Sequence, residues 1–179
     1  IWTPEGSPLA VNHLEFAAAL KKALGGEIPV VPAMRYGQPS IAGAWEELER
    51  GGVTRVLGVP VFPQYAEATT LSAQLKAQEV AALHPVATLE WLPEFYANEG
   101  FLKAWGERVR AAYTGTVGEH VLLSFHGLPI KHILNTAGAG AGCRLNAECC
   151  AAIGTQNVRC YRAQCFATAR GIAQAAGLR

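Results

Sequence analysis

Apolar residues recur along this chain in two alternating patterns, which predict its helices and strands. Five segments place apolar residues at helical spacing and are predicted helices: 8–24, 40–49, 70–83, 100–113 and 162–175. Four short apolar runs are predicted strands: 28–34, 53–61, 86–92 and 121–123. The alternation of strands and helices predicts an α/β fold with a mostly parallel sheet and right-handed crossovers.

The length of 179 residues is enough for one compact domain, or for one domain and part of another. The loop Thr114-Gly115-Thr116-Val117-Gly118 is a candidate boundary between two domains. Half of the residues are hydrophobic and the mean hydropathy is +0.15, yet no apolar run approaches the roughly 20 residues of a membrane-spanning helix.

The net charge of the chain bears on which kinds of partner we expect. A net charge of +1 provides no electrostatic footprint for nucleic acid. The amino-terminal residues show no charged segment followed by an apolar stretch, so we expect no signal peptide. A peripheral contact with a membrane stays open, and so does the oligomeric state.

A histidine follows the predicted strand at 121–123 in a position that suits chemistry. The apolar run leads into Ser124, Phe125, His126, Gly127, Leu128 and Pro129, which include typical loop residues. In open α/β sheets, ligands bind just beyond the carboxyl ends of the strands. A neutral imidazole at such a place can bind a metal or accept a proton near neutral pH. An ordinary polar residue at a strand end is the alternative.

All five cysteines lie in one stretch of the sequence, between residues 143 and 165. This clustering argues against a disulfide scaffold, whose bridges would be spread over the fold. It favours a local metal or cluster site in a protein of cytoplasmic location. There is no Cys-x2-Cys pair, so the segment is not a standard zinc ribbon. Reduced free thiols are the alternative.

The segment Ser124–Pro129 resembles the Ser-Phe-His-Gly-Leu-Pro type of signature found in ferrochelatases, the enzymes that insert iron into a porphyrin. Four further segments resemble motifs of that family, in the family's order: Glu5–Leu9, Met34–Ser40, Pro60–Thr70 and Tyr161–Cys165. The motifs extend from the start of the chain to its last predicted helix, and together they are much more specific than any one of them.

The resemblance implies two Rossmann-like domains with the porphyrin in the cleft between them. Residues 1–117 would form most of the first domain, without its first strand, and 118–179 the start of an incomplete second domain with a Cys-rich insertion at 135–161. The chain would then be a central fragment. The Glu that the family pairs with His126 would lie beyond residue 179, so we expect the isolated chain to be inactive.

The activity implied by the resemblance is that of a lyase of haem biosynthesis, which inserts Fe²⁺ into protoporphyrin IX or coproporphyrin III. The His that matches His126 is the essential one in the family, as a ligand of the substrate metal or as a proton acceptor. Ser7 and Tyr96 match positions that contact porphyrin, although turn chemistry and a half-buried aromatic are their alternatives. Gln64 and Tyr65 follow the predicted strand at 53–61, and we expect them to line the pocket.

Some bacterial ferrochelatases resemble this chain in extra cysteines that hold a [2Fe–2S] cluster. On that basis we expect Cys143, Cys149, Cys150 and Cys160 to be the ligands, with Cys165 as a substitute for Cys149 or Cys150, because adjacent ligands are sterically awkward. Two other functions stay open: a tetrapyrrole chelatase for another metal or macrocycle, and a non-enzymatic iron–sulfur or haem-binding module.

Overall fold

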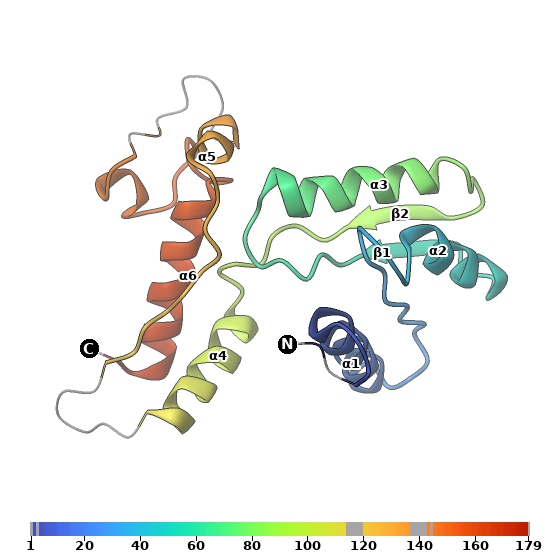
Figure 1. The fold of residues 1–179 in the computed structure, drawn as a ribbon, viewed down its shortest axis with the longest axis horizontal. Helices are drawn as coiled ribbons and strands as arrows, with labels where there is room; N and C mark the ends of the chain where they lie inside the picture. The colour runs from blue at the N-terminus through green and yellow to red at the C-terminus, as the bar shows by residue number, and fades with distance from the viewer. Residues whose placement is uncertain (1, 3, 114–119, 137–142, 144, 179) are drawn as a thin grey trace. The chain divides into compact units, whose positions relative to one another are not determined.

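The computed structural model describes residues 2, 4–113, 120–136, 143 and 145–178 (Figure 1). By their internal contacts these residues form two compact units. The first unit comprises Ile1–Val59 and Ala73–Leu92, and the second comprises Pro60–Ser72 and Pro93–Arg179. Each unit has its own buried residues and is described separately below.

The first unit contains a two-stranded parallel sheet with helices packed against it. Strand β1 (Arg55–Gly58) pairs with β2 (Thr88–Trp91), so that Arg55 lies opposite Thr88 and Gly58 opposite Trp91. Helix α3 (Ser72–Ala81) lies between the two strands in sequence, as the crossover of a parallel pair requires. Helix α2 (Ile41–Arg50) completes the core, in which Trp45, Val80 and Ala87 are buried beside Val56 and Leu89. The parallel pair and its helices confirm the predicted α/β class.

Local signals in the sequence explain where the first two helices begin and end. Helix α1 (Pro8–Ala23) has Pro in its first turn, Lys21 and Lys22 in its last, and two glycines beyond its end. In α2 the Ser40 hydroxyl oxygen accepts a hydrogen bond from the Gly43 backbone N–H at 3.0 Å. Both helices confirm the predictions for residues 8–24 and 40–49.

In the second unit, helices α4 (Glu99–Ala112) and α6 (Tyr161–Ala176) lie side by side (Figure 1). Three shorter elements complete the unit: a π-helical turn at Glu67–Leu71, helix α5 (Ile130–Thr136) and a 3₁₀ turn at Glu148–Cys150. Helix α4 confirms the prediction for residues 100–113, and α6 confirms that for 162–175. The segment predicted as a helix at 70–83 begins with the π-helical turn and continues as α3.

Two of the four predicted strands are absent from the described structure. Residues 28–34 form no regular strand apart from a single bridge between Met34 and Ser40, because Pro29 and Pro32 have no N–H to donate to a ladder. Residues 121–123 were predicted as a strand, and this was wrong. The segment is extended but has no strand partner among the described residues, and Leu122 is 92% exposed.

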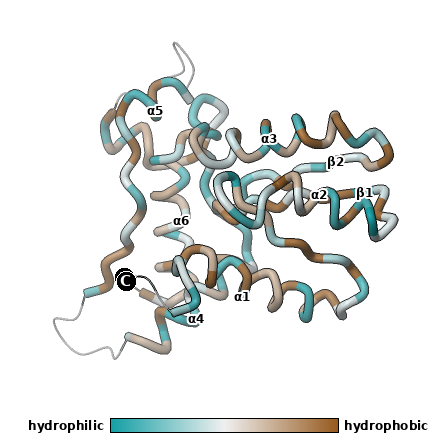
Figure 2. Tube along the Cα trace, turned by 45° about the vertical axis from the view of Figure 1, so that its right-hand side comes forward, coloured by the Kyte–Doolittle hydropathy of each residue, from teal (hydrophilic) through white to brown (hydrophobic). Residues whose placement is uncertain are grey.

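Two other features bear on the sequence predictions. The boundary proposed at residues 117–118 lies outside the described residues, so the division into 1–117 and 118–179 stays a prediction. Within the described part of the chain, no helix is both long enough and apolar enough to cross a bilayer. Figure 2 agrees with this finding, since polar and apolar residues are mixed along the helices.

Candidate functional site

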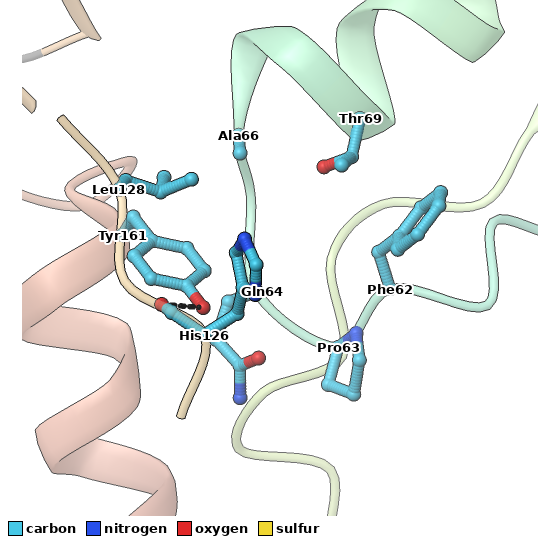
Figure 3. A pocket seen from close by; sticks show the side chains of 8 residues that line it. All are labelled: Phe62, Pro63, Gln64, Ala66, Thr69, His126, Leu128 and Tyr161. Carbon is cyan, nitrogen blue, oxygen red and sulfur yellow. Dashed lines mark hydrogen bonds between the residues drawn. The ribbon is translucent and has the colours of Figure 1, made fainter. Parts of the chain in front are cut away.

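A pocket of about 180 Å³ in the second unit contains the predicted histidine (Figure 3). We call it the His126 pocket. Its lining comes from three places in the sequence: the segment around the π-helical turn, the extended segment 121–129 and the start of α6. The lining residues are Phe62, Pro63, Gln64, Ala66, Thr69, His126, Leu128 and Tyr161. Half of these side chains are purely apolar, and the other four add an imidazole, an amide and two hydroxyl groups.

The loop that carries Gln64 is held from several sides by hydrogen bonds. The Tyr65 backbone N–H donates to Gln164 Oε1 at 2.6 Å, and the Phe95 N–H donates to the Pro63 carbonyl at 3.0 Å. Residues 64–66 are buried as a result. The loop is therefore fixed before any ligand arrives, which suits a binding site.

A buried chain of hydrogen bonds orients the Gln64 side chain. Gln64 Nε2 donates to Thr168 Oγ1 at 2.9 Å, and the Thr168 hydroxyl donates to the Tyr96 carbonyl at 2.8 Å. Thr168 is 1% exposed, so these groups cannot exchange their partners for bulk water. Tyr96, a predicted porphyrin contact, is thereby linked to Gln64 through its backbone carbonyl and the Thr168 hydroxyl.

His126 lies in an extended, exposed stretch of the second unit. Its imidazole lines the pocket, while its backbone carbonyl accepts a hydrogen bond from the Tyr161 hydroxyl at 2.9 Å (Figure 3). Burial, and to a smaller extent the neighbouring Cys165, raise the pKa of Tyr161 to about 12. The phenol therefore keeps its proton at neutral pH and stays a donor.

Four of the predicted ligand cysteines share one apolar cluster. Cys150 and Cys160 are each 3% exposed and pack with Ile133 and Ala163, and Cys143 and Cys149 pack against this group. The Cys149 and Cys150 sulfurs are 3.8 Å apart. Burial raises the pKa of the Cys150 thiol, and Cys149 adds to the increase. Arg162 opposes it, since its Nη1 donates to Cys150 Sγ at 3.0 Å.

Two asparagines shape the segment that contains Cys143, Cys149, Cys150 and Cys160, which we call the cysteine loop. Asn146 Oδ1 accepts from the Cys149 backbone N–H at 3.0 Å. Asn157 Nδ2 donates to the Cys149 carbonyl at 2.7 Å and to the Ala152 carbonyl at 2.9 Å. These bonds join side chains to the backbone, and they hold the loop together with the contacts of the Cys149 and Cys150 sulfurs.

The thiols are not arranged around one point. Across the described residues, no group of three or more His, Cys, Asp or Glu side chains could hold a single metal ion. Cys165 lies on α6 outside the apolar cluster, and burial raises the pKa of its thiol to about 11. None of the five cysteines forms a disulfide.

The predicted porphyrin-binding residues occupy different places. Gln64 lies in the His126 pocket; Tyr65 follows it and has the Arg159 guanidinium 5.0 Å from its ring centre. Ser7 belongs to the first unit, directly before α1, and its side chain makes no helix-capping hydrogen bond. The roles of these residues stay predictions.

Sequence reasoning missed two residues that shape the pocket, Tyr161 and Gln164. Both are in the Tyr161–Cys165 motif, yet neither had been assigned a role. Their signal was the spacing, since residues three apart on a helix share one face. A motif at the first turn of α6 could thus have been read as the wall of a site.

Comparison with known proteins supplies the family. The family model named Ferrochelatase matches residues 1–179. The chain is 38% identical to the ferrochelatase of Bdellovibrio bacteriovorus over 179 residues, 99% of this chain and 52% of that protein. It is 40% identical to that of Stutzerimonas stutzeri, over 100% of this chain and 52% of that protein. It thus spans about half the length of these curated relatives, and it belongs to the ferrochelatase family.

Proposed function

We propose that the protein containing this chain inserts Fe²⁺ into a porphyrin, and that the chain provides the wall of the site that carries His126. The observation that carries the proposal is the placement of the His126 imidazole beside the Gln64 amide in a mostly apolar pocket. Family membership makes a tetrapyrrole the expected substrate.

The chemistry of metallation suits this pocket. Insertion of a metal requires that two pyrrole protons leave and that a metal ion approach one face of the macrocycle. A neutral imidazole can accept a proton or bind the incoming ion. Apolar residues such as Phe62 and Leu128 suit the flat carbon surface of a porphyrin.

The size of the pocket indicates how much of the substrate this wall contacts. Pockets that enclose a whole small molecule have volumes of roughly 300–1,000 Å³. The His126 pocket, at about 180 Å³, fits one edge of a macrocycle. We therefore expect the isolated chain to bind porphyrin weakly and not to metallate it. Ser7, Tyr65 and Tyr96 are proposed as further porphyrin contacts.

The decisive experiment is His126→Ala in the full-length protein, assayed with Fe²⁺ or Zn²⁺ and porphyrin. We expect loss of metallation with an unchanged circular dichroism spectrum, because His126 is exposed and is not part of a buried core. His120→Ala, another exposed histidine close in sequence, is the matched control and should leave the activity unchanged. Activity of His126→Ala within a few-fold of wild type would sink the proposal.

We further propose that the cysteine loop binds a [2Fe–2S] cluster through Cys143, Cys149, Cys150 and Cys160. Their shared apolar cluster supports this ligand set, and the separate position of Cys165 on α6 argues against it as a ligand. The lack of a three-ligand group around one ion is compatible with such a cluster, since each of its two irons takes two of the four thiolates. When bound, the cluster would supply redox chemistry and crosslink the loop.

Anaerobic reconstitution with iron and sulfide tests this ligand set. We expect about two irons and two sulfides per chain, with visible absorption, and loss of both after Cys160→Ser. Cys165→Ser is the control and should keep the cluster. One zinc without sulfide would indicate a structural zinc site, and no bound metal would leave the cysteines as free thiols. Either result would contradict the proposal.

Two alternatives stay testable against the main proposal. A chelatase for another metal or macrocycle would show a higher kcat/KM with that substrate than with Fe²⁺ and protoporphyrin IX or coproporphyrin III. A non-enzymatic iron–sulfur or haem-binding module would lack the Glu that the family pairs with His126, so the complete gene sequence distinguishes it. A cytoplasmic location is proposed and can be checked by cell fractionation.

A further inference from the structure

We propose that Tyr161 is a positioning residue that fixes the direction of the His126 imidazole through the backbone. The proposal rests on the proposed role of His126 and adds a residue through which that role is controlled. Its basis is the hydrogen bond of 2.9 Å from the Tyr161 hydroxyl to the His126 carbonyl oxygen (Figure 3).

The segment that carries His126 has little else to hold its backbone. Residues 121–128 form no regular structure. Within the described part of the chain, the Tyr161 hydroxyl makes the one hydrogen bond that reaches them. Gly127 follows directly, and nothing lies within 4 Å of the place where its side chain would be. The anchored carbonyl therefore belongs to the peptide between His126 and the most flexible residue type.

Tyr161 is itself firmly held, as an anchor must be. It is the first residue of α6 and directly follows the helix-capping Cys160. Its ring packs against the buried cluster that contains Cys150, Cys160 and Ala163. A fixed ring with a protonated hydroxyl holds the peptide plane in one orientation, and that plane sets the backbone torsion from which the His126 side chain projects.

The chemistry is sensitive to such an orientation. An imidazole that accepts a proton or presents a metal must point at the centre of the macrocycle, and small misplacements reduce rates strongly. The hydroxyl is bonded to the backbone, so its loss should affect the step that involves His126 more than the binding of porphyrin. One neutral hydrogen bond of this kind corresponds to a change of roughly three- to tenfold.

The test is Tyr161→Phe in the full-length protein, which removes one oxygen and keeps the ring. We expect kcat to fall roughly three- to tenfold while KM for porphyrin changes less than about twofold. NMR of the ¹⁵N-labelled imidazole should show exchange broadening of the His126 resonance that wild type lacks. Tyr113→Phe, at the half-exposed end of α4, is the control and should change neither kcat nor the His126 resonance.

A double-variant comparison separates this proposal from the one on which it rests. If Tyr161 acts through His126, Tyr161→Phe should not lower further the residual metallation rate of His126→Ala, measured at high enzyme concentration. Full activity of His126→Ala would refute the proposed role of His126. An inactive His126→Ala together with wild-type kcat and an unbroadened resonance in Tyr161→Phe would refute the positioning role alone. Equal losses in both backgrounds would show a merely structural effect, which also overturns it.

Discussion

The Oε1 atom of Gln164 accepts a hydrogen bond from the backbone N–H of Tyr65 at 2.6 Å. The Gln164 side chain is completely buried, and its Nε2 donates to the Val158 carbonyl at 2.6 Å and to Glu94 Oε1 at 3.4 Å. One amide thus joins the loop that carries Gln64, the end of the cysteine loop and the segment before α4. The network satisfies both ends of the amide, as a buried polar group requires.

We predict that Gln164→Leu destabilises the second unit by about 3 kcal/mol, because it leaves the Tyr65 N–H buried without a partner and removes the hydrogen bond to the Val158 carbonyl. Urea unfolding measures this loss, and hydrogen exchange at the Tyr65 amide should speed up. Gln174→Leu, on an exposed position of the same helix, is the control and should stay within about 0.5 kcal/mol of wild type. An equal loss in both variants would refute the role of the network.

The Thr168 hydroxyl gives a second prediction, which concerns the orientation of Gln64. Thr168→Val keeps the shape of the side chain but removes the acceptor for Gln64 and the donor to the Tyr96 carbonyl. We expect a loss of about 2 kcal/mol in stability and a rise in KM for porphyrin. Thr168→Ser retains the hydroxyl and should keep KM near wild type. If Thr168→Ser raises KM as much as Thr168→Val, the hydroxyl is not responsible.

The helices were predictable from the sequence because each carries its own signals. Ser40 caps α2, Pro8 opens α1, and Gly177 ends α6 in a left-handed conformation with φ of 74°. These signals act within a few residues, so a pattern of spacing and caps is enough to find them. The strands at 55–58 and 88–91 were also found, although shorter than predicted.

The failures arose where the structure depends on distant partners. The run at 121–123 has the composition of a buried strand, but a strand requires a hydrogen-bonded neighbour, which an apolar run alone does not specify. The motif containing Tyr161 identified the family, but its contact with the His126 carbonyl depends on how α6 is packed. Pockets form from such long-range contacts, which the spacing of residues in a sequence does not specify. This is why Tyr161 was not assigned to the pocket from the sequence.

Close packing between α4 and α6 leads to a third prediction. A Cβ at Gly106 would lie 2.7 Å from the Ala175 backbone carbon, whereas one at Gly171 would meet the Leu102 side chain at 2.6 Å. A side chain can move aside and a helix backbone cannot, so Gly106→Ala should cost about 2 kcal/mol. Gly171→Ala is the comparison and should cost less. Equal thermal unfolding temperatures for the two variants would contradict this account.

The last prediction concerns pH and the Cys165 thiol. Burial is the main reason that its pKa rises from 9.0 to about 11, and the hydrogen bond with Tyr161 limits the rise. Between these two values the unfolded chain loses the thiol proton while the folded chain keeps it. Stability from this group is therefore complete below about pH 9 and is lost as the pH rises towards 11.

Comparison with Cys165→Ala isolates this contribution from that of other groups that titrate at high pH. At pH 8 we expect the variant to be less stable than wild type by about 1–2 kcal/mol, because the removed sulfur leaves a small cavity in a site that is 8% exposed. As the pH rises from 8 to 10.5, wild type should lose stability faster than the variant, so the difference between them should shrink. Urea unfolding under reducing conditions measures it, and a difference that stays constant would mean that the thiol ionises equally in both states.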